Sequence, residues 1–137
     1  YKFKVLMVGD GQDFDMYKKL ITEKHLEDTI KMLGRKQNPY PYFNVSDCVI
    51  LTSDYEGYPV VFNEAKVLGK PIITTNVSNA DTEINGKYGI VVNKNADDIY
   101  LAMKKMVDDK SIEYKHFDYN LYNDHIMETL EKLIEND

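Results

Sequence analysis

Short runs of apolar residues alternate along this chain with longer stretches in which apolar residues recur every three or four positions. The short runs are rich in Val, Ile and Leu and are typical of buried strands, whereas the longer spacing is typical of helices with one apolar face. The expected strands cover residues 3–8, 29–33, 48–53, 71–75 and 89–93. The expected helices cover residues 14–24, 59–68, 96–107 and 123–135, with a brief helix inside 39–47 and one helical turn at 81–84.

Strands that alternate with helices predict an α/β fold, a Rossmann-like parallel sheet with helices on both faces. The strand runs are continuously apolar, which agrees with burial on both faces. Ligands of such sheets bind at the carboxyl ends of the strands. Four predicted loops lie at that edge, at residues 9–12, 34–36, 54–58 and 76–80. Residues 111–120 read as a polar and aromatic connection that is packed against the domain.

A helix start follows the third expected strand and is suited to bind an anion. Pro59 stands at or near its first position, where the missing N–H costs nothing. The main chain of Tyr58, Val60 and Val61 would present N–H groups there, and the helix dipole favours negative charge. Glu56, in the loop just before, is placed to accept hydrogen bonds from sugar hydroxyls. The pattern therefore predicts a site for a phosphorylated, hydroxyl-rich ligand.

Glu64 is expected inside an apolar stripe of the same helix. At about 100° per residue, the apolar residues Val60, Val61, Ala65 and Leu68 share one face, and Glu64 falls among them. A carboxylate in such a place costs about a few kcal/mol unless it accepts hydrogen bonds. Ligand hydroxyls would supply them, and so would N–H groups or a basic side chain from a neighbouring element.

Composition narrows the class of protein. The 137 residues suffice for one domain with a core, and 43% hydrophobic with 29% charged residues is ordinary for a soluble globular protein. The net charge of −6 and the lack of a basic patch argue against a nucleic-acid binder. No apolar run reaches the roughly 20 residues of a membrane span, and no signal peptide is visible.

Cysteine and histidine give no sign of redox or metal chemistry. The single cysteine, Cys48, has no partner for an internal disulfide, and we expect it in the core of a protein from a reducing compartment. The three histidines are scattered without metal-ligand spacing, so no metal site is expected. They are His25, His116 and His125.

Two further loops carry weaker signals. Gly9 to Gly11 reads first as a tight turn, because Phe14 stands where a dinucleotide fingerprint needs its third glycine. No Walker A sequence is present. Arg35 and Lys36 follow the second strand at the ligand edge, where they would either help to hold a nucleotide or form a solvated turn.

Residues 47–65 and 69–73 strongly resemble the group 1 retaining glycosyltransferases, which have the GT-B fold. The mark of that family is two glutamates with seven residues between them, here Glu56 and Glu64. Residues 8–11 match the family's upstream strand and turn, and residues 86–92 match the turn and strand that usually follow. The resemblance covers nearly the whole chain, and its central block is quite specific.

The resemblance implies a role for each matched residue. Glu56 would be the catalytic residue that contacts hydroxyls of the donor sugar, and Glu64 would accept hydrogen bonds from the ribose. The diphosphate and sugar would be lined by the backbone of Gly57, Tyr58, Pro59 and Val60. Gly11 would also bind substrate, and the turn that holds Arg35 and Lys36 would lie near the base.

The implied reaction is transfer of a hexosyl group from a nucleoside diphosphate sugar to an acceptor, with retention of anomeric configuration and without a cofactor. Family members have an earlier strand whose Arg and Lys grip the pyrophosphate, and an N-terminal domain that binds the acceptor. Residues 1–137 are therefore expected to be the donor-binding domain without its first strand and without the acceptor domain. We expect this chain alone to be inactive. Asn79 and Ala80 stand where the family often has paired glycines.

The resemblance also implies a setting. The acceptor would be a saccharide or a lipid-linked molecule bound through the N-terminal domain, and no nucleic acid would be involved. A composition rich in Lys, Asn and Tyr is associated with AT-rich bacterial genomes, whose enzymes of this family often build capsule, lipopolysaccharide or exopolysaccharide. The expected location is the cytoplasm, with peripheral association of the full-length enzyme at the inner face of the plasma membrane.

Two alternatives stay open on sequence alone. A phosphoacceptor receiver domain also has five βα units, and the expected strand ends place Asp10, Asp54, Thr75 and Lys94 near its site. Receivers, however, normally carry an acidic pair at the first position, and here glycines flank Asp10. Nucleotide-sugar epimerases share the two-domain architecture, although the two-glutamate block favours transfer.

Overall fold

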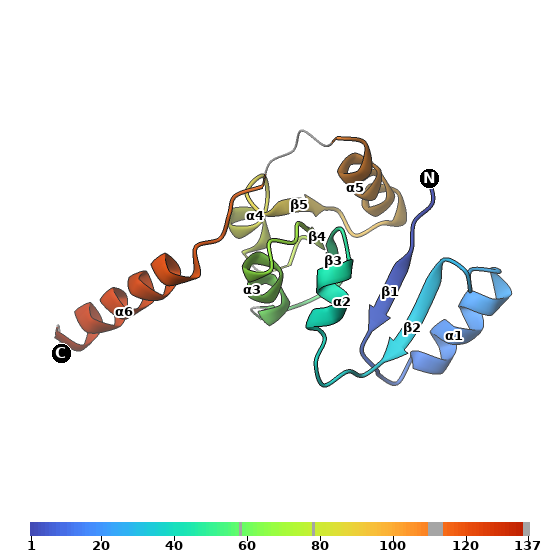
Figure 1. The fold of residues 1–137 in the computed structure, drawn as a ribbon, viewed down its shortest axis with the longest axis horizontal. Coiled ribbons are helices and arrows are strands. Elements are labelled where there is room, and N and C mark those ends of the chain that lie inside the picture. The colour runs from blue at the N-terminus through green and yellow to red at the C-terminus, as the bar shows by residue number, and fades with distance from the viewer. Residues whose placement is uncertain (58, 78, 110–113, 136–137) are drawn as a thin grey trace. The chain divides into compact units, whose positions relative to one another are not determined.

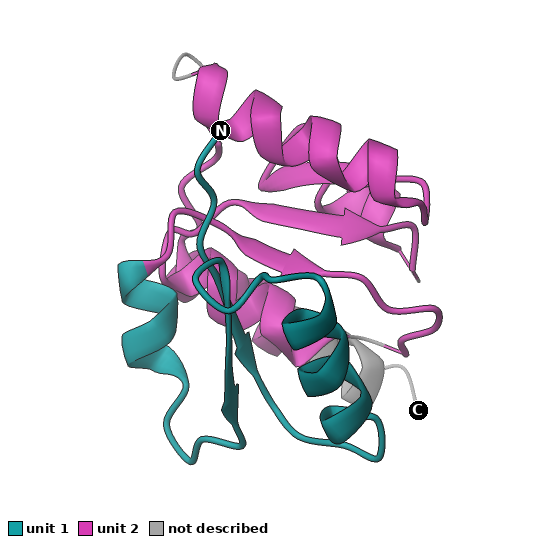
Figure 2. Ribbon diagram, turned by 90° about the vertical axis from the view of Figure 1, so that its right-hand side faces the viewer, with its two compact units in different colours: residues 1–45 teal, residues 46–137 magenta. Residues whose placement is uncertain are grey.

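A computed structural model describes residues 1–57, 59–77, 79–109 and 114–135. For residues 129–135 it describes the backbone only. The chain forms two compact units, Tyr1–Val45 and Ser46–Asp137, which Figure 2 distinguishes by colour. Each unit is an α/β assembly of parallel strands and helices, and the elements alternate along the chain as the hydrophobic pattern predicts (Figure 1).

The first unit contains two parallel strands and two helices. Strand β1 (Val5–Val8) pairs with β2 (Ile30–Gly34), with a register shift between Met7 and Val8. Helix α1 (Phe14–Glu23) connects them, and the short α2 (Tyr40–Val45) follows β2. Gly34 has φ +69°, a conformation that favours glycine, and its carbonyl accepts a hydrogen bond from the Gly9 N–H at 3.0 Å.

The second unit is built on three parallel strands in the order β3-β4-β5. The strands are β3 (Val49–Leu51), β4 (Ile72–Thr75) and β5 (Gly89–Val92). The helices are α3 (Val60–Val67), α4 (Ala80–Glu83), α5 (Ala96–Asp108) and α6 (Tyr119–Glu135). All four residues of the central strand β4 are buried, and α5 packs against β4 and β5.

The core of the second unit combines β4 with the inner faces of three helices. Its buried apolar residues are Phe62, Ala65, Ile72, Ile73, Val77, Ala80, Ile84 and Ala102. Gly89 of β5 lies so close to β4 that a Cβ atom there would be 1.8 Å from the carbonyl oxygen of Ile72. Only glycine permits this approach.

Every expected strand and helix is present, and the fold class is confirmed. Hydrogen bonding among the described residues joins the strands into two sheets rather than the single sheet expected, because the hydrophobic pattern of a strand does not determine which strand pairs with it. Helix α6 begins at Tyr119 rather than at residue 123. The Asp118 carboxylate explains the earlier start, because its Oδ1 accepts hydrogen bonds from the N–H groups of Asn120 at 3.0 Å and Leu121 at 3.1 Å.

The expected packing of the connection before α6 holds for the part that the structure describes. Tyr114 and Phe117 are half-buried, and the Lys115 N–H donates to the Lys87 carbonyl at 2.8 Å. Tyr119, the first residue of α6, is exposed, unlike the half-buried Tyr114, Phe117 and Tyr122.

Candidate functional site

The loop after β3 carries a hydrogen bond between a serine and the first glutamate of the predicted site. Ser53 lies two residues beyond the end of β3, and its Oγ donates to Oε1 of Glu56 at 2.7 Å. Both residues are half-buried. A hydrogen bond to a carboxylate is short and stronger than one between neutral groups. The contact therefore restricts the direction in which the Glu56 side chain points.

Strand β4 fixes the same loop from its other side. Thr75, the last residue of β4, is only 2% exposed, and its Oγ1 donates to the main-chain oxygen of Ser53 at 2.7 Å. The end of the central strand is thus joined to the end of β3, directly before the loop with Glu56.

An ion pair joins the end of β3 to the end of β5. Lys94, two residues after β5, pairs with the Asp54 carboxylate. The two side chains are 50% and 81% exposed, respectively. Exposed pairs of this kind contribute about 0–1 kcal/mol, because water and salt screen them.

Helix α3 starts directly after this loop. Pro59 is buried and occupies the N-cap position, and Val60 is the first helical residue, in agreement with the expected start. The first N–H groups of any α-helix have no acceptor within the helix. The start of α3 therefore offers main-chain donors beside the Glu56 loop. Tyr58, a predicted binding residue, lies outside the described residues.

The predicted apolar stripe of α3 is wrong. Val60 is 68% exposed, and the buried face consists of Phe62, Ala65 and Lys66. Five of the eight helical residues are apolar and lie nearly all around the axis, so periodicity alone could not select the buried face. Glu64 is half-buried on the flank of the helix rather than inside the buried face.

The first unit holds three of the other predicted binding residues, Gly11, Arg35 and Lys36. Gly11 lines a pocket of about 340 Å³ at the end of β1 and the start of α1, together with Gly9 and Asp10. Arg35 and Lys36 are exposed after β2, and Nζ of Lys36 lies 6.0 Å from the centre of the Tyr42 ring. Gly57, exposed in the second unit, shares the loop of Glu56.

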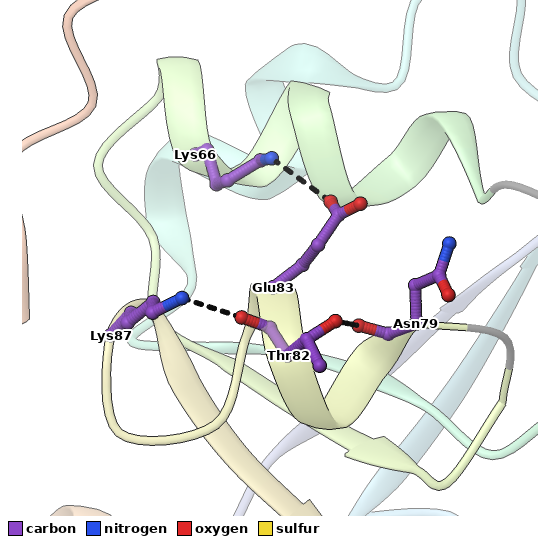
Figure 3. A network of polar contacts seen from close by, with 5 residues as sticks. All are labelled: Lys66, Asn79, Thr82, Glu83 and Lys87. Atoms are coloured by element: carbon purple, nitrogen blue, oxygen red, sulfur yellow. Dashed lines mark hydrogen bonds and ion pairs between the residues drawn. The ribbon is translucent and has the colours of Figure 1, made fainter.

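The buried charge of α3 is a lysine, which the sequence pattern missed. The Lys66 side chain is 4% exposed, and its Nζ lies 3.9 Å from Oε2 of Glu83 on α4 (Figure 3). The same Nζ lies 5.0 Å from the centre of the Phe117 ring, 5.5 Å from that of Tyr88 and 5.9 Å from that of Tyr122. Burial lowers the pKa of Lys66, and the Glu83 carboxylate opposes that effect.

Further polar contacts hold α4 beside this lysine. Nζ of Lys87 donates to the Thr82 carbonyl at 2.6 Å, and Oγ1 of Thr82 donates to the Asn79 carbonyl at 3.0 Å (Figure 3). Asn79 has φ +51°, in the left-handed region that favours glycine. This backbone conformation fits a position at which the resembled family often has glycine.

The lone cysteine has the properties of a packed residue. Cys48 is half-buried before β3, and burial raises the pKa of its thiol, with a smaller contribution from Asp47. A raised pKa keeps the thiol protonated and unreactive.

Neither a metal cluster nor a membrane span is found in the part of the chain that the structure describes. No group of three or more His, Cys, Asp or Glu side chains there is arranged to hold a metal ion. Every helix in the same ranges is too short or too polar to cross a bilayer.

Comparison with known proteins decides the family. A family model described as "Glycosyl transferases group 1" matches residues 1–124. The chain belongs to this family. Membership agrees with the two glutamates around the start of α3 and sets aside the receiver-domain alternative.

Relatives of this group 1 glycosyltransferase chain include the amylovoran biosynthesis glycosyltransferase AmsD of Erwinia amylovora. It is 30% identical over 100 residues, which cover 73% of the chain and 28% of AmsD. The capsular polysaccharide biosynthesis glycosyltransferase CapM of Staphylococcus aureus is 27% identical over 124 residues, which cover 82% of the chain and 30% of CapM. The chain thus spans less than a third of these curated relatives.

A solved structure supports the fold. The structure of Anabaena HepE in complex with UDP and glucose superimposes on this chain with a TM-score of 0.74 and 23% sequence identity. The match covers 94% of this chain and 40% of the HepE chain. Identity at this level shows a shared fold, which for this family member agrees with the GT-B expectation.

Proposed function

We propose that this chain binds the nucleoside diphosphate sugar in a retaining glycosyltransferase. The observation that carries the proposal is the hydrogen-bonded Glu56 in the loop directly before the start of α3. A carboxylate that accepts from hydroxyls, next to main-chain N–H donors and the positive end of a helix dipole, suits a ligand with both sugar hydroxyls and phosphate.

In this proposal Glu56 contacts the donor sugar, and Gly57, Tyr58, Pro59 and Val60 line the diphosphate through their backbone. Glu64, at the half-buried flank of α3, accepts hydrogen bonds from the ribose. Gly11, Arg35 and Lys36, which belong to the first unit, keep the substrate-binding roles that the family resemblance implies. Glu64 is half-buried, so part of its side chain is exposed to solvent, which supports this role.

The proposed reaction breaks the bond between the anomeric carbon and the diphosphate oxygen. A bond forms between the same carbon and an acceptor oxygen, with retained configuration, and the nucleoside diphosphate leaves. No metal or other cofactor is part of the proposal. The names of AmsD and CapM, a biosynthesis glycosyltransferase for amylovoran and one for capsular polysaccharide, support a role in bacterial polysaccharide synthesis. The proposal adds a saccharide or lipid-linked acceptor and a place in the cytoplasm, at the inner face of the plasma membrane.

Calorimetry tests the binding. The chain is titrated with UDP, GDP, UDP-glucose and GDP-mannose, and the titrations are repeated with Glu64→Gln and with Glu128→Gln, an exposed glutamate of α6 that serves as the control. We expect one nucleotide to bind to the wild type, about tenfold weaker binding to Glu64→Gln because hydrogen bonds to a charged group are lost, and no change with the control. Failure of the wild type to bind any of the four ligands would refute the donor-site proposal. Equal binding by Glu64→Gln would refute only the ribose role.

A further inference from the structure

The carboxylate of Glu56 is connected to the core of the second unit through Ser53. Thr75, at the end of the fully buried strand β4, donates to the main-chain oxygen of Ser53 at 2.7 Å. The hydroxyl of Ser53 then donates to Oε1 of Glu56 at 2.7 Å. Two short hydrogen bonds thus lead from a packed strand to a side chain in a loop.

The hydrogen bond from Thr75 holds the main chain of Ser53, the residue whose side chain donates to Glu56. Because Thr75 is 2% exposed, its side chain has little freedom, and the main chain of Ser53 is held against the end of β4. The Ser53 side chain therefore extends from a main chain that is held in place. A hydroxyl in that position selects among the rotamers of the glutamate that it contacts.

The residue after Ser53 makes an exposed ion pair rather than a hydrogen bond to the core. Asp54 and Lys94 form an ion pair between exposed side chains, which solvent screens. Asp54 follows Ser53 directly but contacts Lys94, so we expect the loss of its ion pair to leave the Ser53 hydroxyl in place. Asp54→Asn is therefore a matched control for a substitution at Ser53.

We propose that Ser53 is a positioning residue for Glu56, which orients the carboxylate toward the hydroxyls of the donor sugar. The inference rests on the proposed function of Glu56. A carboxylate has about four acceptor positions, so one hydrogen bond from Ser53 is compatible with others from a sugar. Ser53 then governs the contribution of the sugar to donor affinity, whereas the nucleoside diphosphate binds independently of it.

A measurement without ligand tests the positioning itself. Three-bond couplings in the NMR spectrum report whether the χ1 angle of Glu56 occupies one rotamer or several. We expect one rotamer in the wild type, in Ser53→Thr and in Asp54→Asn, and averaged couplings in Ser53→Ala. If Ser53→Ala keeps the wild-type couplings, Ser53 does not orient Glu56 and the inference is wrong.

Binding measurements test the consequence for the sugar. Affinities for UDP and UDP-glucose, and for GDP and GDP-mannose, are compared across the same four proteins. For the nucleotide that the wild type binds, Ser53→Ala should bind the diphosphate unchanged and its sugar conjugate about tenfold more weakly, the effect of one hydrogen bond to a charged group. Ser53→Thr and Asp54→Asn should match the wild type.

The outcomes separate the inference from the function on which it rests. Equal loss of diphosphate and sugar conjugate in Ser53→Ala would show a structural role for Ser53 and overturn the inference. Unchanged affinity for both would overturn it as well. A wild type that binds none of the four ligands would refute the donor site, while the NMR couplings would still decide whether Ser53 positions Glu56.

Discussion

Lys66 places a cation where α3 packs against its neighbours. Three aromatic rings and the Glu83 carboxylate surround Nζ, and the side chain is almost fully buried. Aromatic rings attract a cation through their faces, but they replace the hydration of an ammonium group only in part. The lowered pKa of Lys66 indicates that loss of hydration outweighs the Glu83 charge.

We expect Lys66→Met to be at least as stable as the wild type at pH 7, because an apolar side chain of similar length avoids the cost of burying the charge. Urea unfolding measures this. In the folded protein the pKa of Lys66 lies below 10.5, the ordinary value for a lysine side chain. The unfolded chain therefore holds the proton more tightly. The stability of the wild type relative to Lys66→Met should therefore rise as the pH approaches 10.5.

Glu83→Gln provides the comparison, because it leaves the buried ammonium without that ion pair and should destabilise the protein at pH 7. A Lys66→Met variant that is less stable than the wild type at pH 7, by a margin that does not depend on pH, would contradict the assignment of a desolvated cation.

At the scale of elements, the hydrophobic pattern predicted every strand and helix, because short apolar runs and helical spacing are local properties of the sequence. It failed at the face of α3 and at the start of α6. Helix α3 is apolar on most sides, so its buried face depends on which neighbouring elements cover it. The start of α6 depends on the N-terminal cap that the Asp118 side chain provides.

The candidate site was predictable to a similar extent. Spacing and family resemblance identified Glu56, Pro59 and Glu64 as residues around one helix start, and the structure places Glu56 and Pro59 there. The contact from Thr75 to Ser53 was not predicted, because it joins residues that are 22 positions apart and depends on the pairing of β3 with β4.

The close approach of β4 and β5 gives a prediction at the same scale. Gly89→Ala places a methyl group 1.8 Å from the Ile72 carbonyl oxygen, so the two paired strands must separate locally. We expect a loss of about 3 kcal/mol in the free energy of unfolding, measured with urea. Gly11→Ala is the control, since a Cβ there meets nothing within 4 Å and its backbone is unstrained. Equal stability of the two variants would show that the strands are not so close.

At the scale of the whole molecule, the relatives are more than three times as long as the part of them that this chain matches. The chain covers 28% of AmsD and 30% of CapM, so we propose that transfer requires more protein than these 137 residues. We expect binding of a nucleotide but no sugar transfer by this chain when UDP-glucose or GDP-mannose is supplied with a lipid-linked acceptor. Release of the nucleoside diphosphate measures turnover. Acceptor-dependent release above the level of a Glu56→Gln variant would contradict this expectation.

The protonated, half-buried thiol of Cys48 has a practical use. A maleimide dye reacts with thiolate and would modify Cys48 slowly, so a cysteine substituted for Tyr55, which is 85% exposed, would be labelled first. The dye would then sit beside the Glu56 loop, and its fluorescence would follow ligand capture in real time without removal of the native cysteine.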